Sequence, residues 1–196
     1  QADAYRQKDL PKSEIGVMRK ISAKASASKD YGQLLAAEMR QTMLWKSIST
    51  DSLTPAIQRL RLQEQHTADP MLKAVWNAVL GKLYKENVYY IDASDEEVAN
   101  KRYRVNRAKA QAYFMKALAQ PELLTRHAST EYAPLTMRGL DGASFGNDML
   151  HLIGFEADSK EAYLEMYTYY NKVGNRGAAC LCAFEVIRKY RQDDVR

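Results

Sequence analysis

The sequence contains few of the residues that interrupt helices or close β-hairpins. Its 196 residues include five prolines and nine glycines. Alternating Val, Ile and Thr runs that end in Asn-Gly or Asp-Gly turns, the strongest sequence signal of β-hairpins, are scarce. With 46% hydrophobic residues, a chain of this length can bury a core of its own. We therefore expect a single, nearly all-helical domain that spans residues 1–196.

The sequence is also poor in cysteine and in long apolar runs. Its two cysteines, Cys180 and Cys182, lie two positions apart in an expected helix and so point to different faces. They cannot readily bond to each other, which excludes a disulfide framework. No apolar run approaches the roughly 18 residues that indicate a membrane span. We expect no membrane-spanning segment in this chain.

Motifs of the common enzyme classes are missing. The sequence contains no G-x-S-x-G, H-E-x-x-H, G-x-x-x-x-G-K-[ST] or G-x-G-x-x-G pattern, so the hydrolase, metalloprotease and nucleotide-binding signatures are absent. Glu161 and Glu165 share the face of an expected helix, but like charges four positions apart are ordinary on solvated faces. We expect no catalytic residue, no cofactor and no metal site.

Helix-start signals divide the chain into helical pairs. Pro11 and Pro70 stand where the first turn of a helix leaves a backbone N–H unused, and Asp30 and Asn175 can cap the helices that follow them. Apolar residues recur at helical spacing between these signals. The predicted fold is all-α, with antiparallel helical hairpins at about residues 11–48, 54–91, 106–137 and 158–192, stacked in a TPR-like or α-solenoid arrangement. The segment near 126–146, rich in glycine, is predicted as an irregular loop.

The stretch FGNDMLHLIGFEAD, residues 145–158, brings a histidine and several carboxylates together. In a helical turn Asn147 and Asp148 would share the face of His151, so an Asp–His pair is geometrically feasible. A zinc or iron site would need two further ligands, which no nearby His or Cys supplies. We interpret the stretch as a structural joint: Asn147 or Asp148 caps a short helix, His151 is buried and hydrogen-bonded to Asp148 or to backbone, and Gly154 ends the helix. A helical enzyme centred on His151 is an alternative.

The segment KRYRVNRAKAQAYFMK, residues 101–116, carries six positive charges and no acid. Without it the formal charge of the chain would fall from +5 to about −1. Basic residues interleaved with aromatic ones are typical of a surface for nucleic acid or for an acidic partner. Four acids at positions 92–97 precede the segment, however, which favours a solvated, self-neutralising surface. The candidate contact residues are Lys101, Arg102, Arg104, Arg107 and Lys109.

Several long phrases follow one another along the chain: LPKSEIGVMRKISAKASASKDYGQLLAAEMRQ, DSLTPAIQRLRLQEQHTADPMLKAVWNAVLGKLYKE, ALAQPELLTRHASTEYAPL, FGNDMLHLIGFEAD and YYNKVGNRGAACLCAFEVIRKY. Together they resemble the N-terminal helical region of large alpha-2-macroglobulin-like proteins from Bacteroidetes-type bacteria. The resemblance covers most of the chain. It implies a fragment of a longer envelope protein whose downstream domains entrap or inhibit proteases. The Cys-x-x-Gln-type thioester pattern of many such proteins does not occur at Cys180 or Cys182.

The resemblance implies a non-enzymatic scaffold or protein-interaction module in a periplasmic, cell-envelope or secreted protein. Gln1, and not Met, stands first, which is expected either after a removed signal peptide or at an engineered boundary. The expected partner is another protein or another domain of the same chain. The alternative is an independent helical-repeat adaptor that binds a peptide or nucleic acid through residues 101–116. Binding that weakens steeply with salt would indicate nucleic acid.

Overall fold

The computed structural model describes residues 2–8, 10–49, 52–87, 96–136, 139 and 141–193. Within these residues it contains α-helices, short 3-10 helices and turns, and no β-strand. The all-α fold class is confirmed. In chain order the helices are α1 (Ala2–Gln7), α2 (Pro11–Ser28), α3 (Tyr31–Ile48), α4 (Leu53–His66), α5 (Pro70–Asn87), α6 (Glu96–Leu118), α7 (Pro121–Leu124), η2 (Ser129–Tyr132), η3 (Gly142–Phe145), α8 (Met149–Ala157), α9 (Lys160–Lys172) and α10 (Arg176–Asp193).

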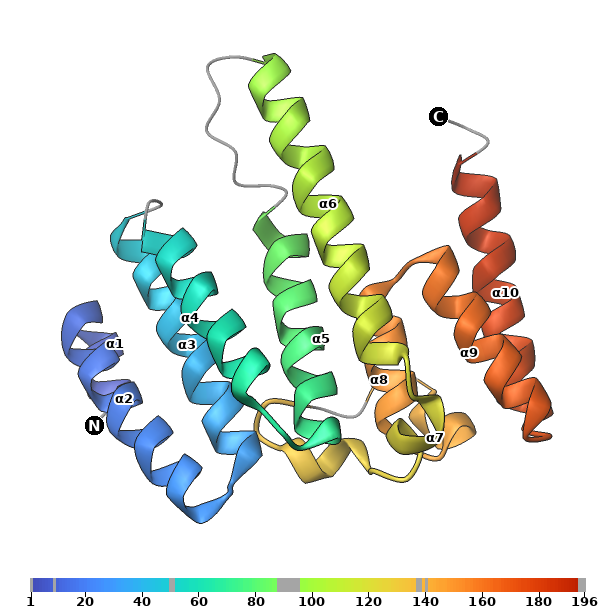
Figure 1. Ribbon diagram of the computed structural model, residues 1–196, viewed down its shortest axis with the longest axis horizontal. Helices are drawn as coiled ribbons and strands as arrows, with labels where there is room; N and C mark the ends of the chain where they lie inside the picture. The colour runs from blue at the N-terminus through green and yellow to red at the C-terminus, as the bar shows by residue number, and fades with distance from the viewer. Residues whose placement is uncertain are drawn as a thin grey trace. The chain divides into compact units, whose positions relative to one another are not determined.

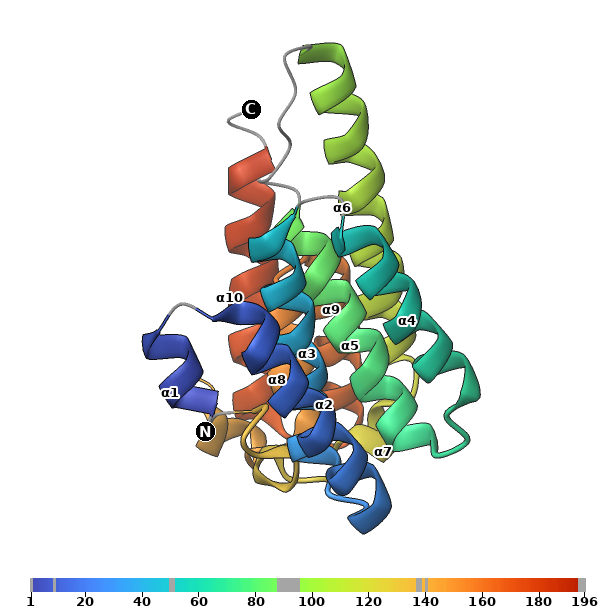
Figure 2. The same ribbon diagram turned by 90° about the vertical axis from the view of Figure 1, so that its left-hand side faces the viewer.

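The chain divides into two compact units. One consists of Gln1–Leu72 with Thr130–Met137, and the other of Lys73–Ser129 with Arg138–Arg196. In the first unit α2 and α3 lie side by side, and in the second α9 and α10 do so (Figure 1). The same pairs remain adjacent when the molecule is turned (Figure 2). The predicted arrangement in antiparallel helical hairpins is therefore confirmed, whereas the grouping of both units into one domain stays a prediction.

Short local signals start the paired helices. Lys29, with a φ of 56°, ends α2, and the Asp30 carboxylate then accepts a hydrogen bond from the backbone N–H of Gln33 at 3.1 Å. In the second unit Ser159 and Asn175 cap α9 and α10 in the same way, with side-chain oxygens 3.2 Å from backbone nitrogens. Each cap satisfies an N–H that has no partner inside its own helix. The chain therefore turns back where the sequence predicted.

Two buried carboxylates determine which helix faces meet in the first unit. Glu14 of α2 accepts hydrogen bonds from Arg40 of α3 at 2.7 and 3.1 Å, and Glu38 of α3 accepts one from Arg59 of α4. Glu14 is 1% exposed, and such a buried charge is costly unless it is paired. The hydrogen bond from Arg40 holds the pKa of Glu14 below its usual range. Rotating α2 or α4 about its axis relative to α3 would separate a buried carboxylate from its arginine partner.

Helix α8 is the central element of the second unit. It contacts α6, α7, η3 and α9, and its buried side chains include Met149, Leu150 and Ile153. Gly154 faces α9 so closely that a Cβ there would lie 2.0 Å from the sulfur of Met166. The lack of a side chain at Gly154 therefore allows α8 and α9 to approach.

Several predicted boundaries differ from the structure. Helix α6 begins at Glu96, not near residue 106, because its first turns are exposed on most sides and carry no apolar stripe that could have marked them. Residues 121–137, predicted as the second part of a hairpin from 106, contain only the short helices α7 and η2 in their described positions. Helix α5 ends at Asn87, and positions 88–91 lie outside the described residues.

The prediction that Gly154 ends the short helix is wrong. Helix α8 continues to Ala157, and Asp158 terminates it in the left-handed conformation with a φ of 50°. Gly154 is placed for close helix packing and not for a helix stop. The predicted irregular segment 126–146 is confirmed in its described residues, which contain η2, η3 and turns.

Candidate functional site

The stretch 145–158 contains the end of the irregular segment and the whole of α8. Asn147 has a φ of 56°, and Asp148 follows it as the N-cap of α8, with its Oδ1 accepting the backbone N–H of His151 at 2.8 Å. The backbone N–H of Ser129 donates to the carbonyl of Asn147 at 2.8 Å, and that of Met149 donates to the carbonyl of residue 127 at 3.0 Å. Of the two predicted capping residues, Asp148 is the one that caps. These contacts attach the loop to the start of the helix.

The imidazole of His151 lies inside an aromatic cluster. It stacks on Phe145, with ring centroids 4.2 Å apart and planes 9° apart, and it meets the edge of Phe155 at 4.6 Å. Only 1% of His151 is exposed. An acid–base catalyst must come within hydrogen-bond reach of its substrate, and a ring enclosed in this way does not reach solvent. The arrangement packs the joint against the core.

A buried carboxylate and a phenol meet next to this cluster, where the ring of Tyr170 lies 5.2 Å from that of Phe145. The hydroxyl of Tyr170 in α9 lies 2.9 Å from both carboxylate oxygens of Asp148. Burial raises the pKa of Asp148, although hydrogen bonds from the backbone of His151 and from Tyr170 act in the opposite direction. Burial and the neighbouring carboxylate also raise the pKa of Tyr170. The pair links the cap of α8 to α9, and both residues are buried.

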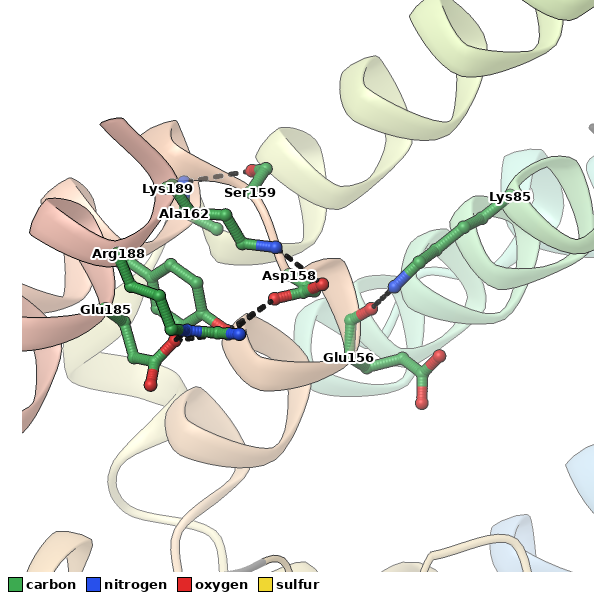
Figure 3. Close-up of polar contacts among 9 residues, drawn as sticks. Lys85, Glu156, Asp158, Ser159, Ala162, Glu185, Arg188 and Lys189 are labelled. Carbon is green, nitrogen blue, oxygen red and sulfur yellow. Dashed lines mark hydrogen bonds and ion pairs between the residues drawn. The ribbon is translucent and has the colours of Figure 1, made fainter. Parts of the chain in front are cut away.

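A second polar group, the Asp158 cluster, holds the turn after α8 against α10. It consists of Asp158, Tyr163, Glu185, Arg188 and Lys189. Figure 3 shows Asp158 beside Arg188 and Lys189 of α10. Asp158 accepts from the Tyr163 hydroxyl at 2.8 Å and lies 2.7 Å from the Lys189 nitrogen. Burial opposes ionisation of Asp158, but these two donors outweigh it and its pKa lies below the usual range.

The neighbouring end of α8 is fixed to α5 by two lysines. Lys85 donates to the backbone carbonyl of Glu156 at 2.6 Å (Figure 3), and Lys82 lies 2.8 Å from the Glu156 carboxylate. Cations at the C-terminal end of a helix complement its dipole. Lys82 also lies 3.6 Å from Glu86. Every cation named here and in the Asp158 cluster faces an anion or a carbonyl of the same unit. These ion pairs and hydrogen bonds therefore hold the helices of the second unit together.

The predicted basic residues all lie on α6 and are all exposed: Lys101, Arg102, Arg104, Arg107 and Lys109. At 100° per residue they are spread over about 220° around the helix axis. Lys109 places its ammonium 5.3 Å from the ring centre of Tyr84, a cation–π contact within the chain. The structure therefore distributes the basic residues around the helix and does not align them along one face. Lys101 and Arg104 line an open pocket together with Glu97, Asn100 and Val105.

The structure reveals an apolar surface that the sequence analysis did not identify. Helix α10 buries Ala178, Ala179, Cys182 and Val186, which recur at helical spacing along one side of the helix. On the opposite side it exposes what we call the outer face of α10: Arg176, Cys180, Phe184, Ile187 and Arg191. Phe184 is 63% exposed and Ile187 is 55% exposed. The spacing of four and three positions from Cys180 to Phe184 to Ile187 was the available signal, because it forms a second apolar stripe in a helix that already had one.

Next to the outer face of α10, Tyr190 of the same helix contacts Lys160 of α9. Tyr190 is 49% exposed, and the ammonium of Lys160 lies 3.5 Å from its ring centre. Among the described residues, six of the eleven large exposed hydrophobic side chains belong to α9, α10 or the turn between them. They are Leu164, Tyr167, Val173, Phe184, Ile187 and Tyr190. Exposed apolar side chains therefore gather on this hairpin.

Comparisons with protein-family models, curated proteins and solved structures find no match to this chain. Within the part of the chain that the structure describes, no helix combines the length and apolar character needed to cross a membrane. Among the same residues, no three His, Cys, Asp or Glu side chains converge to hold a metal ion.

Proposed function

We propose that the chain is a non-enzymatic helical scaffold that docks another protein, or another domain of its own chain, on the outer face of α10. The observation that carries this proposal is the exposure of Phe184 and Ile187 on the side of α10 opposite its buried residues. Large apolar side chains grouped on a folded surface are typical of interaction sites. Aromatic side chains at the centre of such a surface supply much of the binding energy.

The placement of the polar groups supports the same proposal. His151 and Asp148, the strongest acid–base candidates, are buried within the joint and contact aromatic rings or backbone. Nucleic-acid-binding proteins usually cluster their cations on one face. The exposed cations of α6 are instead spread around their helix, which disfavours nucleic acid as the partner. Docking on the outer face of α10 involves neither the buried His151 and Asp148 nor the cations of α6.

Site-specific photocrosslinking tests the docking proposal. A photoreactive phenylalanine analogue replaces Phe184 in the full chain, expressed in the cells that naturally make it, and the adducts are identified by mass spectrometry. A matched variant carries the analogue at Lys24, an exposed position of α2. We expect one defined protein adduct from position 184 and none from position 24. Equal labelling at both positions, or no adduct at 184, would contradict docking on this face.

We further propose that this scaffold belongs to an alpha-2-macroglobulin-like envelope protein whose downstream domains entrap or inhibit proteases. The support is the ordered set of sequence phrases that resemble the N-terminal helical region of such proteins. The complete gene is the test. We expect a signal peptide before Gln1 and a long, β-rich coding sequence after Arg196. A stop codon directly after Arg196 would remove this part of the proposal and would leave the docking proposal intact.

A further inference from the structure

The outer face of α10 combines an apolar centre with a positive charge at each end. At 100° per residue its five members fall within about 80° of one another around the helix axis. They occupy positions i, i+4, i+8, i+11 and i+15, the spacing with which one helix presents a seam to another. Arg176 lies in the first turn, and Arg191 lies in the last. The apolar side chains Phe184 and Ile187 lie between them.

No acidic side chain of the described residues of α10 shares this face. Glu185 lies on another side of the helix, where it accepts a hydrogen bond from Arg188 at 2.7 Å. Neither Arg176 nor Arg191 has an ion-pair partner among the described residues. Within the part of the chain that the structure describes, both guanidinium groups are therefore available at the ends of the apolar stripe. The face is complementary to a surface that is apolar in the middle and negative at both ends.

We propose that the outer face of α10 binds an amphipathic α-helix whose apolar stripe is flanked at both ends by acidic residues. This inference rests on the docking role proposed above and specifies the partner. Arg176 and Arg191 are fifteen positions apart, so the two charges lie about 22 Å apart along the axis. The partner helix needs acids about four turns apart, with apolar residues between them. An extended peptide would not match the alternation of three and four residues along the stripe.

A second copy of the chain is a poorer occupant for a specific electrostatic reason. If two copies of α10 paired in parallel, Arg176 would meet Arg176. If they paired antiparallel, Arg176 would meet Arg191. Either arrangement places like charges opposite each other at both ends, which disfavours association. Self-association therefore serves as one of the outcomes that would overturn the proposal.

Two synthetic helical peptides test the charge pattern against the full chain. Both carry Leu and Ile at the spacing of the stripe, with Glu at both ends in one peptide and Lys at both ends in the other. Fluorescence anisotropy measures their affinities at low and high salt. We expect the Glu peptide to bind at least fivefold more tightly than the Lys peptide, with the difference shrinking as salt is added. The Arg176→Glu, Arg191→Glu double variant should reverse the preference.

Further variants separate the apolar centre from the charged ends. Phe184→Ser should weaken binding of the Glu peptide at least tenfold, because the central aromatic anchor is lost. Lys24→Glu, a charge change on α2, is the matched control and should leave the preference unchanged. All substituted positions are exposed, and a thermal melt checks that each variant remains folded.

Three results would overturn the inference. Equal binding of the two peptides, abolished by Phe184→Ser, would refute the acidic partner while sustaining the docking role. No binding of either peptide would also refute it, and photocrosslinking at position 184 would still decide the docking role independently. A sedimentation coefficient that increases with protein concentration in the wild type, but not in the Phe184→Ser variant, would show that a second copy of the chain covers this face.

Discussion

Replacing Gly32 with alanine should destabilise the first unit, although alanine normally favours a helix. Gly32 is the second residue of α3, and residues 132–133 of the irregular segment pass directly over it. A Cβ at this position would lie 2.1 Å from the carbonyl oxygen of Ala133 and 2.8 Å from the carbonyl carbon of Tyr132. Both neighbours are backbone atoms, so no side-chain rotation can relieve the contact. The segment would have to retreat by on the order of 1 Å.

The magnitude follows from two opposing effects. Inserting a methyl group into a well-packed region typically costs about 1–3 kcal/mol, and a rigid neighbour places Gly32→Ala at the upper end. Alanine in place of glycine in a helix returns about 0.5–1 kcal/mol. The net expectation is a loss of about 2 kcal/mol in the free energy of unfolding. For a chain of this size that corresponds to a melting temperature lower by about 4–8 °C.

Gly16→Ala is the matched control. Gly16 lies within α2 of the same unit, and a Cβ there would meet nothing within 4 Å. This variant should gain about 0.5–1 kcal/mol, because only the helix preference of alanine acts. Urea unfolding followed by circular dichroism gives both values. A Gly32→Ala protein as stable as the wild type, beside a Gly16→Ala protein that shows the expected gain, would refute the assigned contact between α3 and residues 132–133.

Other substitutions test the remaining contacts. Gly154→Ala should lower the free energy of unfolding by about 1–3 kcal/mol. Met166→Ala should rescue part of that loss in a double-mutant cycle, because the thioether of Met166 occupies the space that the new methyl group needs. Additive effects of the two substitutions would contradict this contact. Tyr170→Phe should cost about 1.5–3 kcal/mol in urea unfolding, because buried Asp148 loses a hydrogen-bond donor; an unchanged midpoint would contradict the pair. Glu14→Gln should make stability less dependent on pH in acid. The pKa of Glu14 is lowered in the folded state, so its contribution is present above the unfolded pKa and disappears as pH falls through the folded one. Equal slopes of stability against pH for wild type and variant would exclude this role.

The starts of the paired helices could be predicted because their causes are local. Asp30, Ser159 and Asn175 each satisfy a backbone N–H three residues ahead, an interaction that needs no distant part of the chain. Asp69 does the same for Leu72 at 2.7 Å. The apolar stripes between these caps then indicate which side of each helix is buried.

Helices without a one-sided apolar stripe could not be placed as well. The first half of α6 carries charges around much of its circumference, and its predicted start was ten residues late. In α4, Leu60 is buried and Leu62 is exposed, because only the packing of α4 against α3 decides which of its leucines is covered. Glycine was equally ambiguous. Gly154 has the residue type of a helix stop, but it serves a close contact between α8 and α9.

For the candidate sites, the sequence determined residue types and local spacing, and the tertiary structure determined which groups reach solvent. Sequence spacing could place Asp148 near His151, but only folding placed the imidazole ring between Phe145 and Phe155. Both apolar stripes of α10 are present in the sequence, and nothing local indicates which one the rest of the unit covers. Burial depends on residues far apart along the chain, whereas caps and periodicity depend on neighbours. That difference explains why the fold class could be predicted and the exposed face of α10 could not.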